Sequence, residues 1–545
     1  MKKIALLFIA FTLTNCKSQQ TSTTIKAIKK PKLVVGIVVD QMRYDYLTRF
    51  ENKFGNDGFK RLLNDGYNCK NHHFNYVPTY TGPGHASIYT GTSPMNHGII
   101  ANYWYNKFTD KTVYCAEDTT VKCVGFATDK ERMSPKRMLT TTFGDQLRLH
   151  TQQKAKVIGV SLKDRGAILP AGHSANAAYW FSGKKEGKWV TSTYYTNTLP
   201  KWVVNFNTTT PTYLKTWNTI LPIEKYTESG ADLNTYENSF KGEKTADFPY
   251  DLKKLAPKNK GFDILKATPF GNDMTTDFAL KAIENEQLGV DDITDILTIS
   301  YSSTDYVGHQ FGVNSVEIED TYIRLDRSLA KLFTYLDTQV GKGNYTLFLT
   351  ADHGAVQVPH YLKSQKIPAG YFDNKAFKKQ VEAILVNKFK YDGLVKNISN
   401  QHIFLNRELI TNYNLNLSEI ETFLVQEIVL FNHIDKAYTA NTLNSSQFTN
   451  GTGALIQNGY HQKRSGDVVF VLEPSVISYS KKGSTHGSSF SYDTHVPLLF
   501  YGNGIQKGST LTKTEVIDIA PTVSALLGIA FPNGCTGKPL PFVLK

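Results

Sequence analysis

Short, largely apolar runs recur along the chain, separated by polar stretches. Leu33–Val39, Ile296–Ser300 and Tyr345–Thr350 are rich in β-branched and aromatic residues and lack the alternation of a half-exposed strand. Such runs are typical of strands that are covered on both faces. Lys156–Leu162 and Val496–Tyr501 also have the character of strands. We therefore predict one central sheet built from these segments.

Helical periodicity appears between the strand-like runs, most clearly from Glu317 to Val340. Apolar residues recur there at spacings of three and four: Ile318, Tyr322, Leu325, Leu329, Leu332 and Leu336. Asn314 and Glu317 are placed as the capping pair of this helix. The alternation of strands and helices predicts an α/β fold in which helices sandwich a mostly parallel sheet.

Two segments interrupt this alternation, 176–262 and 355–463. Both are expected to be insertions that cap or flank one catalytic domain covering residues 33–545. The first is rich in aromatic residues, including Trp180, Tyr194, Tyr195 and Trp202. These side chains could line a substrate mouth or form the small core of the insertion itself.

The first sixteen residues have the pattern of an export signal. Two lysines precede an apolar run that is too short to span a membrane and ends near Cys16. Leu13–Cys16 resembles a bacterial lipobox, so lipidation of Cys16 and ordinary cleavage nearby remain as alternatives. We expect export to the periplasm or cell envelope, with residues 17–32 as a flexible tether. Membrane contact is expected only through that lipid.

Charge and cysteine content narrow the functional classes. The 61 basic and 48 acidic residues give a net charge of +13, but no block of five or more Lys and Arg occurs, so nucleic acid is not an expected partner.

Apart from Cys16, the cysteines are Cys69, Cys115, Cys123 and Cys535. Since Cys115 and Cys123 could close a small loop in an oxidising compartment, we predict a disulfide between them. Isolated buried thiols are the alternative.

Acidic and histidine residues follow the strand-like runs. Six side chains make up this set: Asp40, Asp305, His309, Asp352, His353 and His486. Because the carboxyl ends of neighbouring parallel strands meet at one edge of a sheet, these side chains should converge. Three carboxylates and three imidazoles suit zinc, and manganese or cobalt would be tolerable. The sequence therefore predicts a centre for two metal ions.

Thr81 is the candidate nucleophile. Gly82 and Gly84 permit a tight turn and close backbone approach, and Pro83 suits the first position of a helix that extends to Thr90. A hydroxyl beside the start of a helix faces free N–H groups, which suit a phosphoryl group. Because a free threonine hydroxyl is a poor nucleophile, a metal must lower its pKa. A threonine that merely caps the helix is the alternative.

In their order along the chain, these motifs resemble those of the alkaline phosphatase superfamily, and within it the phosphate-irrepressible PafA-type alkaline phosphatases. The resemblance covers nearly all of the chain after the tether, and the ordered set is far more specific than any single motif. Its segments are Val39–Asp45, Thr81–His85, Asn96–Gly98, Ser161–Arg165, Ser303–His309, Ala351–Gly354, Thr485–His486 and Asp518–Gly528. The departure from the family pattern lies in Thr81–Gly84, in a loop that varies among relatives.

The resemblance implies a role for each candidate residue. Asp305, His309 and His486 would bind one zinc ion, and Asp40, Asp352 and His353 the other, together with the Thr81 oxygen. Asn102, Lys163 and Arg165 would surround the transferred phosphoryl group. Outside this set, His85, His97, His173 and His495 are expected to have structural roles.

The charge of the phosphoryl site bears on the choice between a monoester and a diester substrate. Lys163 and Arg165 leave a predicted strand two residues apart, so their side chains should share one face. Two cations suit a monoester, because a diester carries one negative charge fewer and an extra substituent. A surface ion pair with Asp164 is the alternative.

We therefore expect an exported, zinc-dependent phosphatase that hydrolyses small phosphate monoesters of broad range through a phosphothreonine intermediate. A type I phosphodiesterase or nucleotide pyrophosphatase with the same site is the alternative. A sulfatase is disfavoured, because the chain has no Cys/Ser-x-Pro-x-Arg sequence. A surface lipoprotein that only binds phosphate or metal is the alternative from another class.

Overall fold

The computed structural model describes residues 29–128, 130–184 and 186–545. The predicted export signal, the lipid on Cys16 and most of the predicted tether lie outside the described residues. Within the described ranges, no helix combines the length and the apolar character that a membrane span requires.

A ten-stranded sheet forms the centre of the protein. Its strands, in spatial order, are β21 (Gly508–Thr510), β2 (Tyr67–Cys69), β20 (Leu498–Gly502), β13 (Tyr345–Thr350), β1 (Leu33–Val39), β12 (Asp295–Tyr301), β7 (Val157–Ser161), β8 (Ala177–Ser182), β9 (Lys188–Ser192) and β6 (Cys123–Val124). The five strands from β13 to β8 run parallel. Every residue of β1, β12 and β13 is buried, as expected of apolar runs that are covered on both faces.

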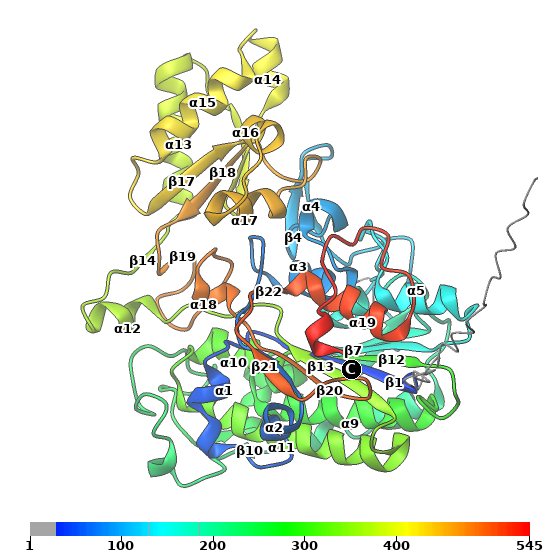
Figure 1. Ribbon diagram of the computed structural model, residues 1–545. Coiled ribbons are helices and arrows are strands. Elements are labelled where there is room, and N and C mark those ends of the chain that lie inside the picture. Colours follow the sequence, from blue (N-terminus) through cyan, green and yellow to red (C-terminus); the bar gives the residue numbers. More distant parts are fainter. Residues whose placement is uncertain (1–28, 129, 185) are drawn as a thin grey trace, which may run out of the picture.

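Helices cover both faces of this sheet and confirm the predicted α/β class (Figure 1). One layer contains α3 (Thr81–Thr90), α5 (Phe143–His150), α6 (Asp164–Ala171) and α19 (Ile519–Leu527). The opposite layer contains α2 (Phe59–Asp65), α9 (Pro269–Asn285) and α11 (Val316–Leu336).

The helix α11 corresponds to the periodic segment, but its predicted cap is wrong by one residue. Ser315 Oγ accepts a hydrogen bond from Ile318 N at 3.1 Å and caps the helix. Asn314 Oδ1 instead accepts a hydrogen bond from Arg49 Nη2 at 2.6 Å. A long-range partner, which the local sequence does not reveal, therefore takes the side chain that was expected to cap.

The second predicted insertion contains a cap with its own sheet, drawn in yellow to orange in Figure 1. The order of its strands is β15 (Val395–Ser399), β16 (His402–Leu405), β18 (Val468–Leu472) and β17 (Ile434–Thr439). Helices α13 (Asn374–Phe389) and α15 (Leu417–Ile428) share an apolar cluster with this sheet. Since β18 follows residue 463, the cap extends further than the predicted insertion.

Helix α17 (Gly451–Gly459) docks the cap on the core. Asn458 Nδ2 donates to the Asn75 carbonyl at 2.7 Å, and Val77 N donates to the Leu455 carbonyl at 3.0 Å. Both core residues lie a few positions before Thr81 in the chain. The cap therefore supports the segment that leads to the candidate nucleophile.

The first predicted insertion begins later than the sequence indicated. Strands β8 and β9, within 176–262, extend the main sheet. Trp180 on β8 is buried, and Trp202 packs against Phe278 with ring centroids 4.9 Å apart. These two aromatic side chains therefore pack in the interior and not at a substrate mouth.

The predicted disulfide between Cys115 and Cys123 is wrong, because both residues are free thiols. Cys115 N donates to the Asn102 carbonyl at 2.9 Å, and its sulfur points toward Gly82. Cys123 instead lies opposite Ser192 of β9 at the edge of the main sheet. The fold thus directs the two cysteines to different places despite their short separation in sequence.

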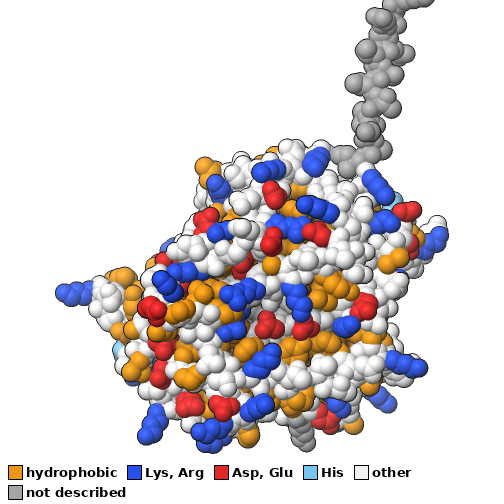
Figure 2. Space-filling view, turned by 90° about the horizontal axis from the view of Figure 1, so that it is seen from below, with side chains coloured by type: hydrophobic (Ala, Val, Ile, Leu, Met, Phe, Trp, Pro, Cys, Tyr) orange, Lys and Arg blue, Asp and Glu red, His pale blue; other side chains and the backbone are white. Residues whose placement is uncertain are grey.

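The excess of basic residues forms no continuous patch on the face of the molecule seen from below. Figure 2 shows Lys and Arg side chains there, intermingled with Asp and Glu and with apolar groups. This distribution matches the dispersed lysines of the sequence.

Candidate active site

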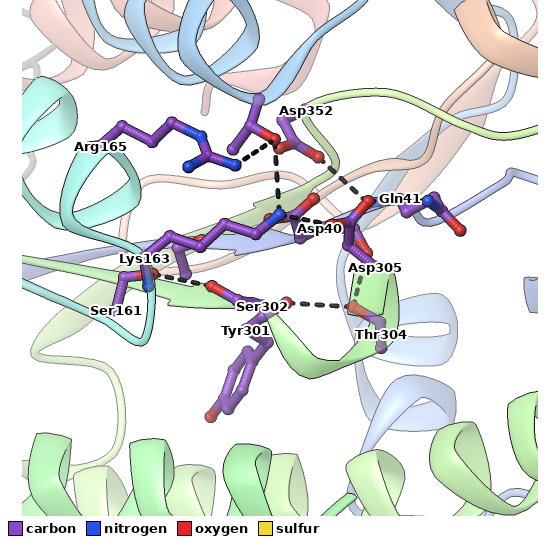
Figure 3. Close-up of polar contacts among 12 residues, drawn as sticks. Asp40, Gln41, Ser161, Lys163, Arg165, Tyr301, Ser302, Thr304, Asp305 and Asp352 are labelled. Carbon is purple, nitrogen blue, oxygen red and sulfur yellow. Dashed lines mark hydrogen bonds and ion pairs between the residues drawn. The ribbon is translucent and has the colours of Figure 1, made fainter. Parts of the chain in front are cut away.

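The six candidate metal ligands come together at the carboxyl end of the central sheet. Asp40 follows β1, and Asp352 and His353 follow β13. Asp305 and His309 lie on α10 (Ser303–Phe311), directly after β12. His486 lies before α18 (Ser491–Thr494). The parallel strands thus bring together residues that are far apart in the chain, as Figure 3 shows for Asp40, Asp305 and Asp352.

Two groups of these side chains have ligand atoms within 4.8 Å of one another. One group contains Asp40, Asp352 and His353, as the resemblance implies. The other contains Asp305, His353 and His486. His309, which was expected in that group, lies beside it, with Nε2 3.2 Å from Asp305 Oδ1. His353 therefore stands between the two groups.

Each of the three histidines offers Nε2 to the centre, because Nδ1 is engaged elsewhere. Nδ1 of His309 lies 2.7 Å from the Ser484 carbonyl. The corresponding distances are 3.0 Å from His353 to the Gly354 carbonyl and 2.7 Å from His486 to the Thr79 carbonyl. Since a carbonyl only accepts, Nδ1 must carry a proton, so Nε2 holds the lone pair whenever the ring is neutral. This is the tautomer that a metal ligand requires.

Several atoms of this centre are buried without a hydrogen-bond partner. Asp40 Oδ1, Asp352 Oδ2 and His353 Nε2 make no hydrogen bond. Burial, with the neighbouring Asp352, raises the pKa of Asp40 well above its usual value. Burial also lowers the pKa of His353 well below its usual value. Unpaired buried acceptors are costly, so the arrangement suits a bound cation.

The nucleophile candidate Thr81 is the first residue of α3, which begins two residues earlier than the sequence indicated. The helical hydrogen bonds start with Gly84 N, which donates to the Tyr80 carbonyl at 2.9 Å. Gly82 N donates to Asn102 Oδ1 at 2.7 Å, which places Asn102 beside the start of α3. Thr81 is buried within the candidate site.

Lys163 and Arg165 both reach Thr81. Lys163 Nζ and Arg165 Nη2 each lie 3.4 Å from Thr81 Oγ1. Lys163 Nζ also donates to Asp40 Oδ2 and Asp305 Oδ2, both at 2.6 Å (Figure 3). Burial would lower the pKa of Lys163, but Asp305 and Asp40 raise it above its usual value. Lys163 therefore stays positively charged despite being only 4% exposed.

Lys163 and Arg165 were predicted to converge because they share one face of a strand, but the structure brings them to Thr81 in another way. Lys163 caps α6, and Arg165 lies in the first turn of that helix, so the two do not share a strand face. The alternative of a surface ion pair with Asp164 is wrong. Asp164 accepts hydrogen bonds from the Tyr114 hydroxyl and from Arg165 N, and Lys163 is directed inward.

Gln41, which was not among the candidates, contacts the centre, and so does His85, for which a structural role was expected. Gln41 Nε2 donates to Asp305 Oδ1 at 2.7 Å, and Gln41 N donates to Asp352 Oδ1 at 3.1 Å (Figure 3). His85 Nδ1 lies 2.9 Å from the Thr81 carbonyl, and its Nε2 lies 2.8 Å from Ser300 Oγ. A non-glycine residue with a positive φ, 64° for Gln41, marks a special position, but a sequence does not display φ.

Comparison with known proteins places this geometry among phosphatases. The family model described as type I phosphodiesterase/nucleotide pyrophosphatase matches residues 34–496. The alkaline phosphatase PafA of Elizabethkingia meningoseptica is 46% identical over 524 residues, which is 95% of each chain. A Myroides odoratus protein named calcium-transporting ATPase is 48% identical over 523 residues, which is 94% of each chain.

The crystal structure of wild-type PafA superposes with a TM-score of 0.91 at 45% identity, covering 95% of this chain and 100% of that chain. A mutant structure of PafA carries substitutions at one threonine, one asparagine, one lysine and one arginine. These four residue types are those of Thr81, Asn102, Lys163 and Arg165 in this chain.

Proposed function

The chain belongs to the type I phosphodiesterase/nucleotide pyrophosphatase family and is an enzyme of the alkaline phosphatase type, and on this premise we propose that it hydrolyses phosphate monoesters with two zinc ions and a covalent intermediate on Thr81. The proposed substrates are small phosphorylated molecules, and the proposed substrate range is broad. We also propose that the enzyme acts in the periplasm or cell envelope, because its first residues have the pattern of an export signal.

The observation that carries the proposal is the position of two cations at the nucleophile. Lys163 Nζ and Arg165 Nη2 are equidistant from Thr81 Oγ1, at 3.4 Å. A phosphoryl group attacked by this oxygen would lie within reach of both side chains. A monoester presents three non-bridging oxygens with up to two negative charges, which two cations can neutralise. A diester offers only one such charge, so it gains less from the pair.

The donor set supports zinc. Carboxylate oxygens and imidazole Nε2 atoms are ligands that zinc prefers, and each histidine is oriented by a backbone carbonyl that accepts its Nδ1 proton. Asp40, Asp352 and His353 would hold one ion, and Asp305, His309 and His486 the other. Bound there, zinc supplies positive charge that lowers the pKa of the threonine hydroxyl and stabilises the departing oxygen.

The residues of the chain then have separate tasks. Thr81 Oγ forms a bond to phosphorus while the bond to the leaving oxygen breaks, which gives a phosphothreonine and an alcohol. Arg165 and Lys163 neutralise the negative charge on the non-bridging oxygens while the phosphoryl group is transferred. Asn102 lies beside these oxygens, held by Gly82 N. Attack by water on the phosphothreonine releases inorganic phosphate and restores Thr81.

Metal removal and replacement test the proposal. Chelator-treated protein should lose hydrolysis of nitrophenyl phosphate, and added zinc should restore it as two equivalents bind. Manganese and cobalt serve as comparison ions. Full activity in protein shown by elemental analysis to be free of metal would contradict the role of zinc.

Phosphodiester hydrolysis is the second candidate, and the description of the matched family model favours it. The name of the Myroides relative refers instead to the hydrolysis of ATP. The terminal phosphoryl group of ATP carries three non-bridging oxygens, as a monoester does, so its hydrolysis is compatible with the same site. The relative rates on monoesters and diesters decide between the two candidates.

A further inference from the structure

A cavity of about 120 Å³ lies between the cap and the core, next to the candidate metal centre. Strand β18 of the cap supplies one wall, and the segment from His486 to Asp493 supplies another. Figure 1 shows β18 and β19 (Val476–Ile477) on the side of the cap that faces α18. The cavity therefore exists only because the cap is docked over the core.

His486 belongs both to the cavity wall and to one of the ligand groups. Tyr80, the residue before the candidate nucleophile, also lines the cavity and packs edge-on against His486, with ring centroids 5.6 Å apart. The cavity therefore adjoins the ligand group of Asp305, His353 and His486, with His486 and Tyr80 in the shared wall. A leaving group bound beside His486 would have to extend past Tyr80 to enter the cavity.

The lining combines apolar side chains with polar ones, two of them acidic. Val77, Ile456 and Val471 are among its apolar side chains. None of the described residues that line the cavity is Lys or Arg, whereas two of them are acidic, Asp493 and Glu473. Asp493 is 1% exposed; its Oδ2 accepts a hydrogen bond from Ser488 N, but its Oδ1 has no hydrogen-bond partner.

We propose that this cavity binds the leaving group of the substrate and selects alcohols with a small apolar body, about the size of one ring, that are neutral or positively charged. The size is suitable, since a dry cavity of roughly 150 Å³ can hold benzene. Anionic leaving groups are disfavoured by the Glu473 side chain and by the lack of a cation among the described lining residues. This inference rests on the proposed function, because it names a substrate class for the same site.

Phosphonates test the cavity without any chemical step. Titration calorimetry on the zinc-loaded enzyme would compare methylphosphonate, benzylphosphonate and 4-carboxybenzylphosphonate. Benzylphosphonate should bind about tenfold or more tightly than methylphosphonate, because the ring leaves water for an apolar wall. The carboxylated ring should lose most of that gain. Equal affinity for methylphosphonate and benzylphosphonate would overturn the proposal.

Two substitutions at one position separate filling of the cavity from general damage. Val471→Trp should abolish the preference for the benzyl group while leaving the affinity for methylphosphonate unchanged. Val471→Ala, the matched control, should keep the preference, because it leaves the cavity open. An equal loss of affinity for both phosphonates in Val471→Trp would contradict the assignment. If Val471→Trp does not fold, the wild-type and Val471→Ala affinities still decide the matter.

Turnover is measured separately with phenyl phosphate. Absence of phosphate release from the zinc-loaded enzyme would contradict the proposed monoesterase function. Unequal phosphonate affinities would still support the cavity in that case. The two failures are therefore distinguishable.

Discussion

The imidazole ring of His353 lies parallel to that of His486, with ring centroids 3.4 Å apart and planes inclined by 11°. Stacked this closely, the two rings cannot both be positively charged without strong repulsion. Burial, reinforced by His486, lowers the pKa of His353 well below its usual value, and burial lowers the pKa of His486 to about 3. Both rings are therefore neutral near pH 7 and can offer lone pairs to cations.

Because His353 belongs to both ligand groups, it should matter more for metal content than His309. His353→Ala removes a ligand of the ion beside Asp40 and Asp352 and also a neighbour of Asp305 and His486, so we expect it to bind less zinc than His309→Ala. His309→Ala should keep the ion held by Asp40, Asp352 and His353. Elemental analysis after dialysis against zinc-free buffer checks this, and equal zinc contents in the two variants would contradict it.

Thr81→Ala should lower kcat/KM for nitrophenyl phosphate by on the order of 10³-fold or more, because it removes the hydroxyl that Lys163 and Arg165 both reach. Thr81→Ser should keep substantial activity, since it keeps the oxygen. Acid quenching during turnover, followed by mass spectrometry, should find phosphate on residue 81 in the wild type and in the serine variant. Phosphate on a different residue would refute the assignment.

Gly84→Ala should impair metal binding through a backbone clash. A Cβ at this position would lie 2.4 Å from the Asp352 carbonyl oxygen and 2.7 Å from Asp352 Cβ. Asp352 would have to move, which should weaken zinc affinity and activity together. Gly144→Ala in α5 is the control, because its nearest contact would be a Val157 methyl at 3.3 Å. Zinc titrations of the two variants should differ, and unchanged zinc affinity in Gly84→Ala would oppose this account.

Glu237 and Glu317 form a buried acid pair outside the active site. Burial, with the neighbouring Glu317, raises the pKa of Glu237 from 4.5 to about 10, and burial raises the pKa of Glu317 to about 8. The folded state therefore holds protons that the unfolded state has lost above about pH 4.5. It follows that the pair contributes stability at low pH that is lost as the pH rises toward these folded-state values.

Glu237→Gln should reduce this loss of stability, because glutamine has no proton to release. Thermal midpoints measured between about pH 5 and 9 should fall less steeply in the variant than in the wild type. An equally steep fall in the two proteins would show that Glu237 is already ionised in the folded protein.

The candidate metal ligands could be predicted from the sequence because their signal is local. Asp40 directly follows β1, and Asp352 lies close behind the end of β13. Both strands are buried on both faces, and parallel strands end at the same edge of a sheet. Gln41 was not predictable in this way, because its importance depends on contacts with Asp305 and Asp352 far along the chain. Long-range contacts also decide the helix cap at Ser315 and the separation of Cys115 from Cys123.

The cap illustrates the same limit. Its composition predicts an insertion, but its docking depends on pairs such as Asn458 with Asn75, which are 383 residues apart. The cavity beside His486 arises from this docking and has no counterpart in any local pattern. The convergence of the candidate metal ligands could therefore be predicted from the sequence, whereas the cavity beside His486 could not.

The most direct test of the account compares monoester and diester hydrolysis on one sample of known zinc content. The substrates are nitrophenyl phosphate and methyl nitrophenyl phosphate, and the proteins are the wild type and the double variant Lys163→Ala, Arg165→Ala. Because both cations lie 3.4 Å from Thr81 Oγ1, the wild type should prefer the monoester. The double variant should lose far more monoester activity than diester activity. Equal losses on the two substrates, or a wild type that prefers the diester, would contradict the central claim.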